Sequence, residues 1–171
     1  MNKSNYPFGS PIFKFRLVVP DNYNHDEYID QCTQKIMRLE STYGYSRLLT
    51  SENFANASKK LEHGKTYIAE ILPILSEERV SGDECIAFYK RKKAIMTGAH
   101  GLLLAYNQMK KELPKCIYIA SFDEKEALLL WSGQRGVPGI STLPGDKFEF
   151  QVYPFTDKLH GHDCILCIYK E

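Results

Sequence analysis

Residues 98–101 read Gly-Ala-His-Gly and lie between a predicted strand and a predicted helix. Glycines let a backbone turn sharply and approach a ligand, and the amides at a helix N-terminus favour an anion such as phosphate or carboxylate. His100 adds an imidazole that exchanges protons near neutral pH. This pattern indicates an anion-binding turn. The simpler alternative is that Gly98 and Gly101 only let the chain turn and the helix pack closely.

Ser121 and Asp123 follow another predicted strand, at 116–121. If that strand and the one at 94–97 are parallel neighbours, a right-handed crossover brings their carboxyl ends to one edge of the sheet, where α/β proteins bind ligands. In such a site His100 is the candidate acid or base, and Asp123 would orient the substrate or the imidazole. The expected ligand-binding residues are Gly98, Ala99, His100, Gly101, Ser121 and Asp123.

These residues complete no known catalytic or nucleotide-binding motif. The turn has two glycines where the dinucleotide fingerprint has three, and the chain has no Gly-x-x-x-x-Gly-Lys-Ser/Thr phosphate loop. It also lacks a Gly-x-Ser-x-Gly elbow and a His-Glu-x-x-His helix. The sequence therefore points to no cofactor and leaves open whether the protein is an enzyme.

A second cluster gathers side chains that zinc prefers: Asp157, His160, His162 and Cys164. These four residues are the candidate metal ligands. Side chains alternate between the two faces of a strand, so Cys167 would point away from His162 and Cys164. The alternative is that the cysteines belong to the core and the rest to a polar loop.

The charge and the aromatic residues indicate which class of macromolecule the protein could bind. Lys plus Arg number 22 and Asp plus Glu 21, a net charge of +1, and the basic runs at 90–93 and 110–111 lie at predicted helix ends, where cations are favoured. We therefore expect no nucleic-acid partner. Tyr153, Phe155 and Tyr169 could form a surface for a protein partner; alternatively, they complete the core.

The cysteine count and hydropathy bear on the compartment. Five cysteines are an odd number, and no apolar stretch reaches the length of a membrane span. We expect a cytoplasmic protein without a membrane partner.

The expected function is that of a small, soluble, non-catalytic interaction or accessory protein that binds another protein. The alternative is a protein that binds an anionic small molecule (nucleotide or phosphate), or a hydrolase, using residues 98–101. The oligomeric state stays open.

Hydrophobic periodicity predicts the elements that position these residues. Helices are expected over about 25–43, from 81 to about 91, over about 102–113, and briefly after Ser121, with loops at 44–64 and 132–145. The expected strands are 12–19, 66–74, 94–97, 116–121, 147–152 and 163–169. The last two strands are expected to pair as a hairpin.

This order of elements predicts an α/β (or α+β) fold. We expect a single mixed sheet with a parallel βαβ centre and an antiparallel C-terminal hairpin, with helices packed on one or both faces. A chain of 171 residues is long enough for one core, so a single globular domain is expected over 11–171. Residues 1–10, rich in Asn, Ser, Pro and Gly, are expected to be a flexible N-terminus.

Overall fold

The computed structural model describes residues 7–37, 50–54, 59–75, 79–115, 117–123, 133–144 and 147–171. Its main sheet contains β1 (Phe13–Val18), β2 (Thr66–Pro73), β4 (Tyr118–Ala120), β5 (Gly136–Leu143), β6 (Lys147–Pro154) and β8 (Asp163–Lys170). A second, two-stranded sheet joins β3 (Arg79–Val80) to β7 (Leu159–His160). The helices are α1 (His25–Met37), α2 (Ser51–Phe54), α3 (Gly82–Lys92) and α4 (Gly98–Met109).

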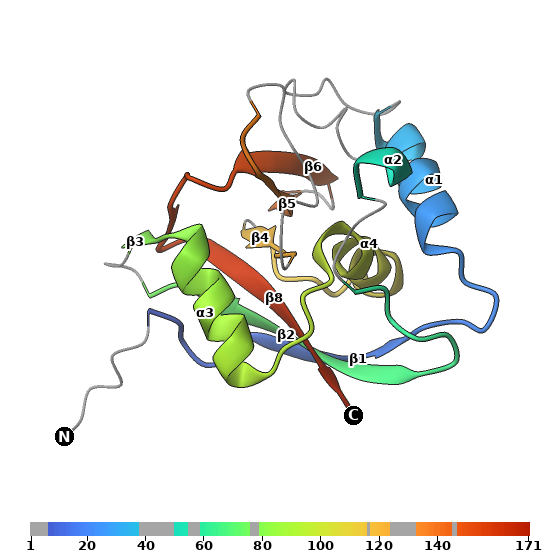
Figure 1. The fold of residues 1–171 in the computed structure, drawn as a ribbon, viewed down its shortest axis with the longest axis horizontal. Coiled ribbons are helices and arrows are strands. Elements are labelled where there is room, and N and C mark those ends of the chain that lie inside the picture. The colour runs from blue at the N-terminus through green and yellow to red at the C-terminus, as the bar shows by residue number, and fades with distance from the viewer. Residues whose placement is uncertain are drawn as a thin grey trace.

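The main sheet is mixed, with the strand order β1-β2-β8-β4-β5-β6 (Figure 1). Only β4 and β8 run parallel, and the other neighbouring pairs are antiparallel. The antiparallel C-terminal hairpin is formed by β5 and β6, in a register that pairs Ile140 with Phe150. The predicted α/β fold with a mixed sheet and such a hairpin is confirmed.

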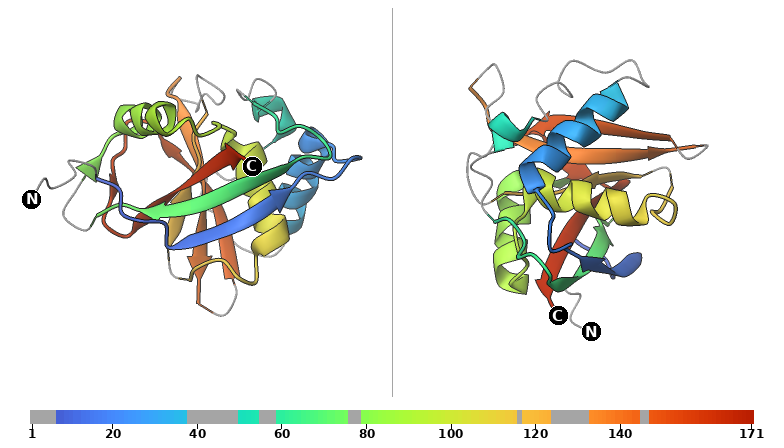
Figure 2. Two further views of the ribbon diagram at one scale, coloured as in Figure 1. Left: turned by 90° about the horizontal axis from the view of Figure 1, so that it is seen from below. Right: turned by 90° about the vertical axis from the view of Figure 1, so that its right-hand side faces the viewer.

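Different helices cover the two faces of the sheet. Leu166 and Ile168 of β8 pack in one core cluster with Leu103 of α4 and Ile29 of α1. The alternate residues Ile165 and Cys167 of the same strand belong to a second cluster that includes Phe88 of α3. Accordingly, Figure 2 shows α3 on one side of β8 and the α1 and α4 pair on the other.

A capping box starts α3, as the sequence Ser81-Gly-Asp-Glu84 predicts. The Glu84 amide donates to Ser81 Oγ at 3.3 Å, and the Ser81 amide donates to Glu84 Oε2 at 2.8 Å. These bonds satisfy amides that the first turn of a helix leaves open. The helix is followed by the C-cap residue Lys93, whose φ of 56° is left-handed.

The pairing predicted for the last strand is wrong. Strand β8 does not pair with β6; it lies in the middle of the sheet, between β2 and β4. The physical reason is its composition, since all residues from Cys164 to Ile168 are buried. A strand that is apolar on both faces belongs in the centre, whereas the alternating pattern of β6 suits an edge.

The loop predicted at 132–145 is also wrong in part, because β5 occupies most of it. Its glycines and prolines hide the strand from propensity rules, which read them as turn residues. The structure gives Gly139 a packing role instead. A Cβ there would lie 2.1 Å from the Tyr118 hydroxyl, so the ring of Tyr118 lies against bare backbone on the neighbouring strand.

Ordered contacts reach further toward the N-terminus than the sequence indicates. Phe8 is buried and forms a bridge with Ile74, and the Gly9 amide donates to the Pro73 carbonyl at 2.9 Å. The predicted end of the first helix beyond residue 37 and the short helix predicted after Ser121 lie outside the described residues. Among the helices described, none has the length and apolar character needed to cross a membrane.

Candidate functional site

Residues 94–97 do not form a strand parallel to β4, so the assumption behind the predicted site is wrong. Ile95 makes a single antiparallel bridge with Ile168, whereas β4 runs parallel to β8. Residues 94–97 and β4 therefore lie along the same edge of β8 and approach each other end to end. Even so, the Gly98 amide donates to the Phe122 carbonyl at 3.2 Å, which makes Gly98 and Asp123 neighbours.

The Gly-Ala-His-Gly segment is the first turn of α4, and all four of its residues are buried. Gly98 has a φ of +46°, and a Cβ there would lie 1.8 Å from Asp123 Oδ2. At Gly101 a Cβ would lie 1.9 Å from Thr97 Oγ1. Ser121 and Asp123 are buried as well. These glycines are needed for close packing, and a ligand-binding role for this segment stays a prediction.

His100 contacts a different carboxylate from the one expected. Its Nε2 lies 3.1 Å from Asp26 Oδ1 of α1, and the Lys60 Nζ lies 2.6 Å from Asp26 Oδ2. Burial lowers the pKa of His100 more than the Asp26 carboxylate raises it. Burial would raise the pKa of Asp26, but hydrogen bonds from Lys60 and His100 outweigh it and leave that pKa lowered. The side chain of His100 is 0% exposed, so it cannot touch a substrate in this structure.

The four candidate metal ligands do not come together. Asp157, His160 and His162 are exposed, whereas Cys164 is buried in the cluster beneath α1 and α4. The His160 amide donates to Asp163 Oδ2 at 2.8 Å, which ties that loop to the start of β8. Among the residues that the structure describes, no three or more His, Cys, Asp or Glu side chains are positioned to hold a metal ion together.

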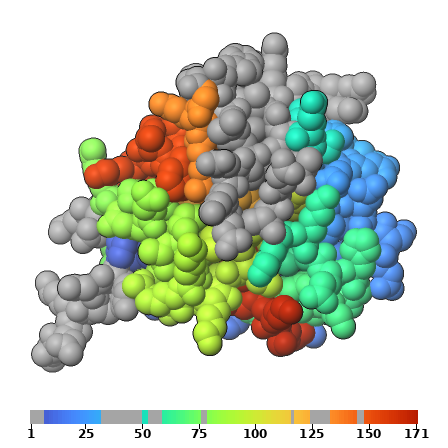
Figure 3. Space-filling view, viewed as in Figure 1, coloured from blue at the N-terminus to red at the C-terminus, as the bar shows by residue number. Residues whose placement is uncertain are grey.

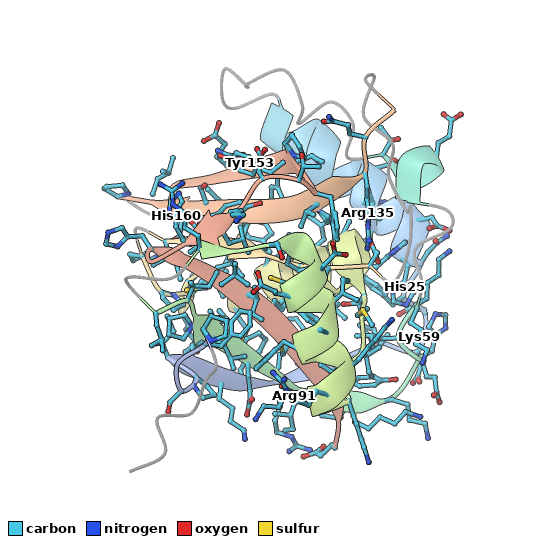
Figure 4. The ribbon with its side chains drawn as sticks, turned by 60° about the vertical axis from the view of Figure 1, so that its left-hand side comes forward. His25, Lys59, Arg91, Arg135, Tyr153 and His160 are labelled. Atoms are coloured by element: carbon cyan, nitrogen blue, oxygen red, sulfur yellow. The ribbon has the colours of Figure 1, made fainter. Side chains whose placement is uncertain are left out.

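Two of these residues instead line a cavity of about 490 Å³ on the α3 face of the sheet. It lies between the end of the main sheet, the start of α3 and the β3–β7 pair. Figure 4 shows Tyr153 and His160 on this side, and Figure 3 shows the surface of α3 bordering that of the segment from β6 to β7. Aromatic and charged side chains among its walls are Arg79, Tyr118, Phe122, Tyr153, Phe155, Asp157, Lys158, His160 and Asp163.

The aromatic walls of the cavity are fixed by packing. The Tyr118 and Tyr153 rings meet edge to face, with centroids 5.0 Å apart. Phe155 lies against Gly82, where a Cβ would be 2.5 Å from its ring, and the Arg135 guanidinium lies 4.2 Å from the ring centroid. Arg135 also donates to the Asp123 carbonyl. The rings are therefore largely preformed, which limits the entropy that a ligand must offset.

Charge is unevenly distributed around the rings. Burial and then the nearby Glu149, Asp163 and Asp157 raise the pKa of Tyr153, so acidic groups lie on its side. Arg79 comes from β3, pairs in register with His160, and is exposed. Within the part of the chain that the structure describes, its guanidinium forms no salt bridge. The planar donors of the Arg79 guanidinium suit a carboxylate, sulfonate or phosphate on a bound molecule.

Sequence reasoning identified some of these residues for other reasons. Tyr153 and Phe155 were expected on a partner surface, and Asp157 and His160 in a metal site. Arg79, Tyr118 and Phe122 carried no signal, because β3 has two residues and Tyr118 and Phe122 read as ordinary apolar positions. Comparison with known proteins adds nothing to this picture, since searches of protein-family models, curated proteins and solved structures each find no match to the chain.

Proposed function

We propose that this is a non-catalytic binding protein that takes a small aromatic molecule with one negatively charged group into the cavity. The observation that carries the proposal is the combination of preformed aromatic walls with an arginine that forms no salt bridge among the described residues. Apolar walls with few polar groups are the usual composition of small-molecule sites. A cytoplasmic location, expected from the sequence, is part of the same proposal.

Two interactions would bind the ligand: contacts with the aromatic rings and hydrogen bonds from a charged side chain. An aromatic ligand beside Tyr153 and Phe155 removes apolar surface from water and gains edge-to-face or stacked contacts. Its anionic group would accept hydrogen bonds from the Arg79 guanidinium, whose planar donors suit a carboxylate, sulfonate or phosphate. Lys158 lies at the same rim, and its charge contributes to the lowered pKa of Glu84 at the start of α3. In this proposal the anionic group of the ligand would lie on the β3 side of the cavity.

Fluorescence titration with anilinonaphthalene sulfonate, an aromatic anion that brightens in apolar sites, tests the aromatic part of the proposal. We expect saturable binding of one dye per chain. Tyr153→Ala should weaken binding about fivefold or more, since a lost aromatic contact is worth roughly 1 kcal/mol. Tyr153→Phe keeps the ring and should bind like the parent. Equal affinity of the parent and Tyr153→Ala would exclude this cavity as the dye site.

Binding of a protein partner, the first expectation from the sequence, stays a second proposal. The feature that favours it is Tyr153, which is 41% exposed at the mouth of the cavity and lies on edge strand β6. Exposed tyrosines are enriched in protein interfaces. A partner that uses this surface should compete with the dye for the cavity. A partner that binds with the dye still in place would have to use another surface.

A further inference from the structure

Two buried histidines, on the opposite face of the sheet from the cavity, each have one ring nitrogen fixed and the other without a partner. The Nε2–H of His25 donates to the Leu61 carbonyl at 2.9 Å, and the Nε2–H of His100 donates to Asp26 Oδ1 at 3.1 Å. Because a carbonyl and a carboxylate only accept, each Nδ1 atom carries a lone pair. Both Nδ1 atoms are buried, with no hydrogen-bond partner among the described residues.

This arrangement is unusual in two respects. Leaving a buried acceptor without a donor costs roughly 1–3 kcal/mol, and here two such acceptors occur in rings whose centroids are 5.6 Å apart. In addition, histidines that bind metals are oriented in just this manner. One ring nitrogen donates to a carboxylate or a backbone carbonyl, and the other nitrogen binds the ion.

A third imidazole, that of His63, lies beside His25. The ring centroids of His63 and His25 are 5.8 Å apart. Two imidazoles on one tetrahedral zinc ion, each with a Zn–N bond of about 2.0–2.1 Å, have centroids roughly 5 Å apart. The observed spacings exceed this value by less than about 1 Å. A surface cavity of about 390 Å³ is lined by His25, Asp26, Lys60 and His63 among others, and His100 lies behind this lining, with its side chain fully buried.

We propose that His25, His63 and His100 form a binding site for a divalent ion of the zinc class, with water as a further ligand. The side chains as they stand do not converge on a single metal position. Forming the site requires rotation of the exposed His63 side chain and a local opening at the Nδ1 atoms of the other two rings, which are both buried. Neutral imidazoles are the preferred ligands of such ions.

Lys60 makes a distinctive prediction, because its positive charge opposes a metal ion at this position. Its Nζ pairs with Asp26 Oδ2, and its charge disfavours a positive charge on both His25 and His100. Replacing it by glutamine removes the repulsion and frees a carboxylate oxygen beside the site. Lys60→Gln should therefore bind the ion more tightly than the parent. A purely structural role for the histidines predicts no such gain.

Zinc titration of the purified full chain, in competition with a chromophoric chelator, tests the proposal. We expect one ion per chain with micromolar affinity, at least about tenfold weaker binding in His63→Ala, and tighter binding in Lys60→Gln. His162→Ala removes another exposed histidine outside the cluster and should bind like the parent. The absence of zinc binding by the parent, or binding that neither His63→Ala nor Lys60→Gln alters, would overturn the proposal. Circular dichroism checks that each variant is folded.

Discussion

His100 and Asp26 are 74 positions apart in the chain, yet their side chains meet with His100 Nε2 3.1 Å from Asp26 Oδ1. The contact joins the first turn of α4 to the first turn of α1. Lys60 forms a salt bridge with the same carboxylate, which connects the segment 59–65 to the two helices. One carboxylate thus connects three segments that are distant in sequence.

Asp26→Ala should destabilise the protein by about 1–3 kcal/mol, because it leaves the buried Nε2–H of His100 without an acceptor. The free energy of urea unfolding measures the loss. Glu27→Ala is the matched control, since it removes an acidic residue from the same helical turn but not from this contact. Equal losses in the two variants would mean that the helix dipole, and not the contact with His100, accounts for the effect of Asp26.

Gly98→Ala should cost clearly more stability than Gly133→Ala. Both glycines have a left-handed backbone, with φ of +46° and +74°, so alanine strains both by roughly 1 kcal/mol. Only Gly98 also faces a neighbour, because its added Cβ would lie 1.8 Å from Asp123 Oδ2 whereas that of Gly133 meets nothing within 4 Å. Thermal and urea unfolding of the two variants measure the difference. Similar losses would contradict the packing role assigned to Gly98.

Glu84 should make stability depend on pH through the capping box of α3. Hydrogen bonds from Ser81 lower the pKa of Glu84 from its ordinary value of 4.5. Its folded pKa lies below its unfolded pKa, so its contribution is present above about pH 4.5 and is lost as the pH falls through the folded pKa. We expect Glu84→Gln to be less stable than the parent at neutral pH, because it lacks the charge on the carboxylate, and we expect the gap to narrow as the pH falls toward about 3.

Unfolding free energies of the parent and Glu84→Gln across pH 3 to 7, at roughly one-unit steps, check this expectation. Asp83→Asn serves as the control, because it removes an acidic residue from the same turn but not from the capping box. A gap between the parent and Glu84→Gln that stays constant over the whole range would argue against an ionised Glu84 in the cap.

Local patterns predicted most of the elements correctly. The alternation from Phe13 to Val18, the helical spacing after His25 and the capping box at Ser81 each depend on neighbours within a few residues, and each is found in the structure. Strand β5 was not predicted, because Gly139 read as a turn residue. The reason for a glycine at this position is the ring of Tyr118, which packs against it from another strand. Long-range packing of this kind leaves no local signal.

The sites were harder to predict than the elements. His100 stood out in the sequence, but its partner Asp26 looked like an ordinary acidic residue of a first helical turn. The cavity gathers residues from β3 to the start of β8, and only the strand order brings them together. Pairing of β8 with β2 and β4, in place of β6, is the feature that sets this order, and no residue spacing encodes it.

The proposed function is tested most directly by comparing two ligands that differ in charge. Anilinonaphthalene sulfonate and uncharged N-phenylnaphthylamine share their rings, and calorimetric titration of both against the parent, Arg79→Gln and Arg91→Gln isolates the role of the cavity arginine. We predict that Arg79→Gln weakens binding of the sulfonate about fivefold to tenfold and leaves the uncharged ligand unaffected. Arg91→Gln, an exposed arginine of α3 outside the cavity, should change neither. Equal binding of the sulfonate by the parent and Arg79→Gln would contradict the proposed recognition of an aromatic anion.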